Sequence, residues 1–215
     1  MSTGQRSGVR EDTARFPITV RTAAGQVDRS GVREVLRSCL EAESVVAGAS
    51  IGLLFCGDRA MKELNAQFRG KDRTTDVLSF PEDPGLDGAG GPGGPGGTGG
   101  TRRGAAESHG APGVGAVDLE PGDGPFLGDI AVSLPQCILQ AREQAVDPGE
   151  ELVRLLVHGV LHLLGHDHME AEERKRMVAR ERVCRRRAKS LGLGPGLLIA
   201  RPGGRTVPSP GSRRR

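Results

Sequence analysis

A stretch rich in glycine and proline at residues 82–125 constrains the fold more than any other feature of the sequence. It holds 16 glycines and 6 prolines in 44 positions. Such a segment buries too little apolar surface to offset the conformational entropy lost on ordering. Glycine does not recur at every third position, which excludes a collagen-like triple helix. We therefore expect a flexible insertion that loops out of a folded domain.

Both ends of the 215-residue chain are also expected to lie outside the folded core. Residues 1–14 are polar and are predicted to be disordered. Residues 191–215, which contain several Gly and Pro, are predicted to form a basic disordered tail. The sequence therefore predicts one domain over residues 15–190, interrupted by the insertion at 82–125.

Short apolar runs predict four strands, and apolar residues at helical spacing predict the helices around them. The strands are expected at residues 16–20, 50–55, 76–80 and 127–132. Four helix starts carry an N-cap residue. These N-caps are Asp28, Asp58, Ser133 and Asp147. A last, arginine-rich helix is expected over residues 169–188. We predict a small mixed four-stranded sheet covered by helices, of the α/β or α+β class.

The charge of the chain is uneven. Residues 170–215 hold 14 Lys/Arg and 4 Asp/Glu, although the whole chain carries only +3. A basic end on a mildly acidic body favours a polyanionic partner such as nucleic acid. An ordinary solvated tail would show the same composition, so the hypothesis that the tail binds RNA through phosphate contacts needs a direct test.

The sequence also excludes several classes of protein. The four cysteines form no CxxC pair, which argues against a cysteine zinc site. The N-terminus lacks the apolar run of a signal peptide. No stretch approaches the roughly 18 apolar residues of a membrane span. We expect a cytoplasmic protein with reduced thiols and no membrane partner.

Histidines gather at the end of one predicted helix. His158 and His162 are four residues apart, so their side chains project from one face, where two imidazoles can bind one metal ion. Gly165 allows the chain to turn at the helix end. The turn can return a third imidazole, from His166 or His168, to the same point. Three nitrogen ligands leave one tetrahedral position for water. The zinc site is therefore expected on this helix and the turn after it.

The spacing of these histidines also matches the zinc-protease motif HExxHxxGxxH. One position differs: Gly159 stands where that motif has the glutamate that acts as general base. A protease built on this helix would lack its proton acceptor. The difference argues against peptide hydrolysis unless a base comes from another part of the chain.

Three segments together resemble the YbeY family of rRNA maturation factors. Residues 155–168, LLVHGVLHLLGHDH, resemble its zinc signature. Residues 64–81, LNAQFRGKDRTTDVLSFP, resemble a second signature, and residues 127–130, LGDI, a third and shorter one. The segments occur in the family order, and the resemblance covers roughly residues 16–187. Two positions depart from the usual pattern: His166 replaces Tyr, and Thr74 replaces Pro.

The resemblance implies a metal-dependent endoribonuclease specific for single strands. It implies action in processing of the 16S rRNA 3′ end and in ribosome quality control, with the small ribosomal subunit or assembly factors as partners. It implies one zinc ion on His158, His162 and His168, and a functional arginine at Arg69. The residues agree, because a guanidinium in the basic loop that Arg69 begins can bind a phosphate and stabilise developing charge.

Several points stay open from the sequence alone. The nucleophile could be zinc hydroxide or the RNA 2′-OH, and Asp76 and Asp129 are only guesses for a general base. Two other functions compete with the nuclease. A metal-dependent hydrolase could act on another substrate, such as a peptide. A non-catalytic ribosome assembly factor could hold a structural zinc, with His166 completing a closed four-ligand shell.

Overall fold

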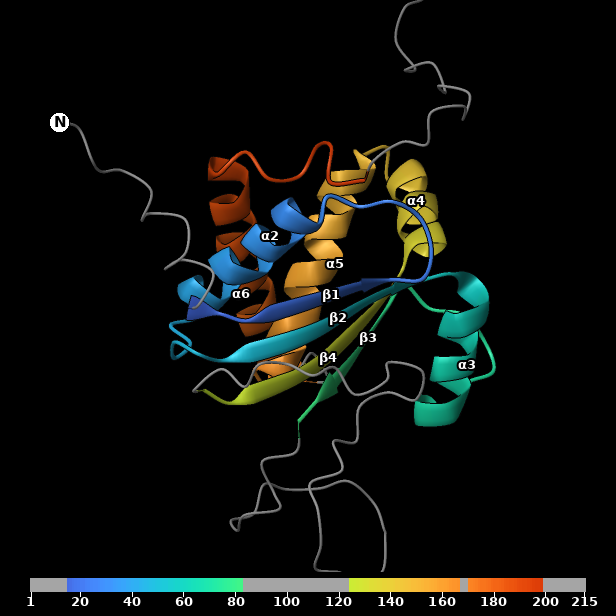
Figure 1. The fold of residues 1–215 in the computed structure, drawn as a ribbon, viewed down its shortest axis with the longest axis horizontal. Coiled ribbons are helices and arrows are strands. Elements are labelled where there is room, and N and C mark those ends of the chain that lie inside the picture. The colour runs from blue at the N-terminus through green and yellow to red at the C-terminus, as the bar shows by residue number, and fades with distance from the viewer. Residues whose placement is uncertain (1–14, 83–123, 167–169, 199–215) are drawn as a thin grey trace, which may run out of the picture.

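The computed structural model describes residues 15–82, 124–166 and 170–198 (Figure 1). The predicted N-terminal segment 1–14, nearly all of the insertion and the tail beyond residue 198 lie outside these ranges. Within them, no helix is long and apolar enough to cross a membrane.

Four strands form one mixed sheet, as predicted. They are β1 (Ile18–Thr22), β2 (Ser50–Cys56), β3 (Val77–Pro81) and β4 (Phe126–Ser133). The spatial order is β1-β2-β4-β3. β2 runs parallel to both β1 and β4, whereas the edge strand β3 is antiparallel to β4. Because β3 and β4 are neighbours, the insertion between them leaves and re-enters the fold at one edge of the sheet.

Helices cover both faces of the sheet. They are α2 (Arg29–Ala42), α3 (Asp58–Arg69), α4 (Leu134–Glu143), α5 (Pro148–Leu163) and α6 (Ala171–Ser190). The side chains of Asp28, Ser133 and Asp147 accept hydrogen bonds from backbone N–H groups in the first turns of α2, α4 and α5. These three caps were predicted from the sequence, and each satisfies a donor that a helix start leaves unpaired.

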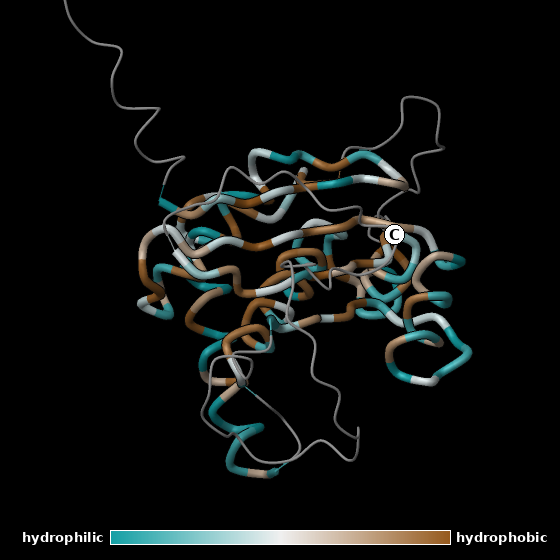
Figure 2. The backbone as a smooth tube through the Cα atoms, turned by 60° about the horizontal axis from the view of Figure 1, so that its bottom comes forward, coloured by the Kyte–Doolittle hydropathy of each residue, from teal (hydrophilic) through white to brown (hydrophobic). Residues whose placement is uncertain are grey.

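Two hydrophobic clusters lie on opposite faces of the sheet, because successive strand residues point to opposite sides. In β4, Ile130 and Val132 belong to the larger cluster, which α2, α5 and α6 share, whereas Ala131 belongs to a smaller one that includes Met61 and Leu64 of α3. Figure 1 shows α5 crossing the sheet on the side away from α3. Figure 2 shows hydrophobic stretches concentrated in the middle of the fold and hydrophilic ones at its periphery.

Two expectations differ from the structure. Asp58 does not cap α3, since Gly57 is the N-cap residue and no side chain completes the cap. The Asp58 carboxylate instead accepts a hydrogen bond from Ser133 Oγ at 2.7 Å, so a tertiary contact outweighs the local capping preference. Residues 191–198, placed in the tail by their composition, pack on the domain: Leu197 is buried, and its carbonyl accepts from the Asp28 amide.

Candidate metal centre

Helix α5 carries the candidate site near its C-terminal end, and its N-terminal end is fixed by a strong set of capping residues. Asp147 caps the helix and Pro148 occupies its first position. Glu150 and Glu151 lie in the first turn, where their negative charge interacts favourably with the positive end of the helix dipole. The opposite end carries His158 and His162. The helix ends at Leu163, and Gly165 follows with a φ of +80°. This left-handed conformation favours glycine and ends the helix, as the sequence predicted.

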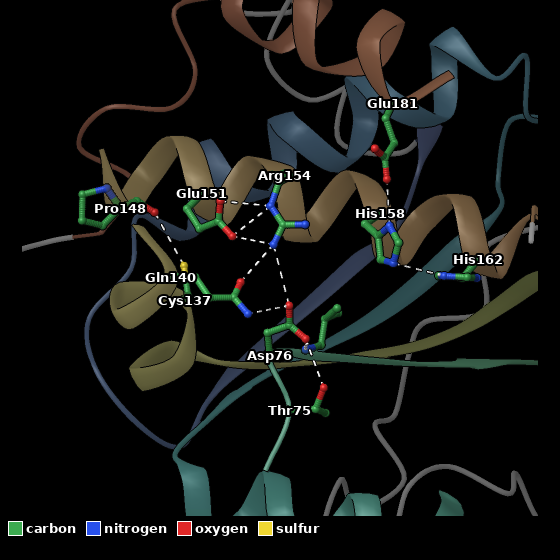
Figure 3. Close-up of polar contacts among 11 residues, drawn as sticks. Thr75, Asp76, Cys137, Gln140, Pro148, Glu151, Arg154, His158, His162 and Glu181 are labelled. Carbon is green, nitrogen blue, oxygen red and sulfur yellow. Dashed lines mark hydrogen bonds and ion pairs between the residues drawn. The ribbon is translucent and has the colours of Figure 1, made fainter. Parts of the chain in front are cut away.

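The two α5 histidines have the geometry of a metal-binding pair. Their Nε2 atoms lie 3.2 Å apart and their rings are close to perpendicular, at 85°. Zinc–nitrogen bonds of about 2.0–2.1 Å at tetrahedral angles would separate two ligand nitrogens by about 3.3 Å. The spacing of His158 and His162 therefore fits a single zinc ion. Figure 3 shows the two rings converging from adjacent turns of α5.

Glu181 of α6 orients the first of these rings. Its Oε1 atom lies 2.8 Å from His158 Nδ1, and this hydrogen bond holds the pKa of the Glu181 carboxyl below its ordinary value. An ionised carboxylate on Nδ1 makes that nitrogen the proton carrier and leaves Nε2 as the metal ligand. The sequence gives no signal for Glu181, because it lies 23 residues from His158 and reaches it only through helix packing.

The third ligand is not placed by the structure. His168 lies outside the described residues, so its role stays a prediction. Across residues 15–82, 124–166 and 170–198, no group of three His, Cys, Asp or Glu side chains could hold a metal ion. His166, the alternative ligand, has its Nε2 atom 3.6 Å from Glu43. That contact with Glu43, at the end of α2, does not support His166 as the third ligand.

The histidine pair opens into a cleft of about 690 Å³. The cleft is basic, and its wall includes Arg69, which the resemblance implies is functional. Arg69 ends α3 and donates from Nη2 to the Ser79 carbonyl oxygen at 3.0 Å. The structure thus brings Arg69 to the same cleft as His158 and His162, although they are about ninety residues apart in the sequence. The other cations on its wall are Lys71, Arg73 and Arg154.

A network of side chains fixes the inner wall of the cleft. Arg154 lies one turn before His158 on α5 and forms a salt bridge with Glu151. It also donates to Gln140 at 3.0 Å and lies 3.7 Å from Asp76 (Figure 3). The spacing of four residues from His158 places Arg154 on the same helix face. That spacing is a signal from which the sequence alone could have identified it.

Neither carboxylate that the sequence offered as a base is well suited to that role. Burial raises the pKa of Asp76, but hydrogen bonds from Gln140, the Val77 amide and Thr75 outweigh it, and the pKa is lowered overall. A general base works best with a pKa near the operating pH. Asp129 lies next to Ile130, which faces α5, so its side chain points to the other face of the sheet, where burial raises its pKa.

Replacing Asp76 with asparagine is expected to destabilise the fold in a pH-dependent way. The lowered pKa means that ionised Asp76 stabilises the folded state above its ordinary value of 3.8, and that this stabilisation is lost as the pH falls below it. Asp76→Asn should lower the free energy of unfolding by about 1–3 kcal/mol at pH 7. Urea unfolding should show that the difference in free energy of unfolding between the variant and the wild type becomes smaller at acid pH.

Asp72→Asn is the matched control for this change. Asp72 lies in the same loop, but its side chain is 82% exposed and forms an ion pair with Lys62. Its replacement should alter stability little at any pH, since exposed pairs contribute little. An Asp76→Asn deficit of the same size at pH 7 and in acid would contradict the role assigned to the ionised carboxylate.

The fold and the site define an α/β protein with a pair of histidines, set at the spacing of metal ligands, in a basic cleft. Residues 18–189 match the family described as Endoribonuclease YbeY. The chain belongs to the YbeY family, as the motifs predicted.

Three named relatives show the extent of the similarity. The endoribonuclease YbeY of Anaeromyxobacter sp. (strain Fw109-5) is 36% identical over 135 residues, 63% of this chain and 52% of that protein. The chain thus spans about half of that relative. The Halalkalibacterium halodurans protein of the same name is 35% identical over 70% of this chain and 79% of its own length. The Moorella thermoacetica protein of the same name is 36% identical over 71% of this chain and 81% of its own length.

The chain is also similar to a solved structure. The solution structure of TM1509 from Thermotoga maritima is 24% identical to this chain and has a TM-score of 0.47. The match covers 81% of this chain and 91% of that one.

Proposed function

We propose that the chain is a cytoplasmic, zinc-dependent endoribonuclease that cuts single-stranded rRNA near the 16S 3′ end during maturation of the small ribosomal subunit. One zinc ion is bound by His158, His162 and His168. The observation that carries the proposal is the Nε2 pair, set 3.2 Å apart and open to a cleft with four basic side chains. Membership of the YbeY family supports the choice of RNA as substrate.

The residues of the cleft divide the chemistry between them. A zinc ion bound there supplies a Lewis acid that polarises a phosphoryl oxygen. Arg69 is held by the Ser79 carbonyl on the wall of the cleft, where its remaining N–H donors can bind the scissile phosphate. Glu181 keeps the proton on Nδ1 of His158, so that Nε2 stays available as a ligand. Lys71 and Arg73 attract the flanking phosphates.

The test is cleavage of a labelled single-stranded rRNA fragment by the purified chain, beside the same sequence annealed to its complement. We expect cleavage of the single strand, loss of cleavage on chelation, and recovery when zinc is restored. The end groups of the products identify the nucleophile: a 2′,3′-cyclic phosphate indicates the RNA 2′-OH, and a 5′-phosphate indicates water. Folded protein that holds one zinc ion but cleaves no RNA would favour an assembly factor, and proteolysis sensitive to a chelator would favour a peptidase.

Replacing Arg69 with alanine is expected to slow cleavage by about 10- to 100-fold, the effect of losing one hydrogen bond to a charged group. Arg69→Lys should recover part of the rate, because it keeps the charge but not the two-pronged geometry. The exposed Arg59, in the first turn of the same helix and paired with Glu63, is the matched control. Equal rates for Arg69→Ala and Arg59→Ala would contradict a role for Arg69 in the reaction.

A further inference from the structure

A second cleft, of about 570 Å³, lies beside the candidate site. It is formed by α6, the first turns of α5 and the short segment that follows α6. Val153, Leu193 and Pro195 give it an apolar lining, and Glu150 is its single acidic residue. The other charged residues on its wall are basic and all come from α6: Arg182, Arg185, Arg186 and Lys189. The charged lining therefore carries a net +3.

These four cations form a stripe on one face of α6. Their spacing of three, four and seven residues places them on adjacent turns, and all four are exposed. Like charges four residues apart destabilise a helix by a few tenths of a kcal/mol. In the described parts of the chain, none of the four has a hydrogen-bonded carboxylate partner, whereas Arg180 and Arg187 of the same helix pair with Glu43 and Glu41. The stripe thus presents four exposed positive charges on one face of the helix.

The second cleft and the histidine cleft both use residues of α5. Val153 lines the second cleft, and its neighbour Arg154 lines the first. From Val153 to His158 is five residues, about 7.5 Å along the helix axis. Arg185 is one turn from Glu181, the partner of His158. A single extended polymer can therefore contact both clefts.

We infer that this second cleft binds the phosphate backbone of single-stranded RNA beyond the segment held at the histidine pair. Its cations match a polyanion, and its apolar surface can pack against an unstacked base or ribose. The inference rests on the proposed function for the identity of the polymer. It extends that function by assigning a second contact site to the substrate, which makes recognition depend on RNA length.

The test compares the binding of two labelled single-stranded RNAs to the full-length chain, measured by fluorescence anisotropy at several salt concentrations. One RNA has about 4 nucleotides and the other about 16, a range that brackets known single-strand sites. Titrations are run at low temperature in chelator, and the RNA is recovered to confirm that it is intact. The variant carries four substitutions, Arg182→Gln, Arg185→Gln, Arg186→Gln and Lys189→Gln. The matched control removes four exposed arginines outside both clefts, Arg29, Arg59, Arg142 and Arg176.

The variant is expected to bind the longer RNA about 10- to 100-fold more weakly and to lower its salt slope by about 2–3, at roughly 0.7 for each phosphate that the protein no longer neutralises. The shorter RNA should bind the variant and the wild type alike. Equal weakening in the control, or unchanged binding of the longer RNA, would overturn the inference and leave an acidic protein as the occupant of the cleft. If the wild type cuts no RNA but binds it through these residues, the proposed function fails and this inference stands.

Discussion

Replacing His158 with alanine is expected to abolish RNA cleavage, lowering it by about 10³-fold or more, the scale on which catalytic groups act. The variant loses one of two nitrogens that lie 3.2 Å apart and also the ring that Glu181 orients. It should retain less zinc than wild type. The fold should survive, because the side chain is 25% exposed and its removal leaves no closed cavity. Zinc content, cleavage rate and urea unfolding of one preparation measure the three effects.

Glu181→Gln is the graded companion to this change. The carboxylate contacts His158 Nδ1 but does not face the cleft as a ligand. Removing its charge should weaken zinc binding by about 10- to 100-fold, and cleavage should recover at high zinc concentration. His158→Ala should not recover in this way. A His158→Ala protein that holds one zinc ion and cuts RNA at the wild-type rate would exclude the proposed centre.

Replacing Gly159 with glutamate is expected to destabilise the fold by at least about 3 kcal/mol, combining overpacking with the burial of a charge. A Cβ atom at this position would lie 2.9 Å from Ile130 Cγ2 and 3.1 Å from Ile130 Cδ1. The Gly159 carbonyl also accepts a hydrogen bond from Ser79 Oγ at 3.2 Å. α5 thus contacts the sheet directly where the zinc-protease motif has its glutamate, and the structure has no room for that side chain.

Ala179→Glu is the control for this substitution. Ala179 is an exposed position on α6, so the same side chain and charge enter a helix without contacting the sheet. Urea unfolding should show a change of less than about 0.5 kcal/mol for Ala179→Glu. A Gly159→Glu protein as stable as this control would mean that α5 can shift on the sheet, and the steric argument against the protease arrangement would fail.

The sequence was most informative where the chemistry is local. The cap at Asp147, the spacing of His158 and His162 and the turn at Gly165 all depend on residues within one helix and its ends, and the structure has each of them. The prediction that Asp58 caps α3 was wrong, because the Asp58 carboxylate accepts a hydrogen bond from Ser133, which is distant in the sequence. A capping preference of about 1 kcal/mol is small enough for one tertiary hydrogen bond to replace.

The rest of the site depends on packing between distant segments. Arg69 and His158 line one cleft because β3 lies at the sheet edge beside β4 and packs against α5. Strand order and direction follow from pairings that no local pattern encodes. The contact of Glu181 with His158 also depends on long-range packing, since nothing near Glu181 in the sequence indicates that α6 lies along α5. The packing of residues 191–198 was also missed, because their composition suggests a tail and only the burial of Leu197 shows otherwise.

The antiparallel pairing of β3 with β4 makes the chain tolerant to changes in length at one point. The backbones on either side of the insertion remain hydrogen-bonded, with the Glu82 amide donating to the Leu127 carbonyl. Doubling the length of a loop closed in this way costs only about 0.6 kcal/mol. A fluorophore or an affinity tag placed between these two strands should therefore leave the fold intact. This junction is the natural attachment point for a reporter group on the protein.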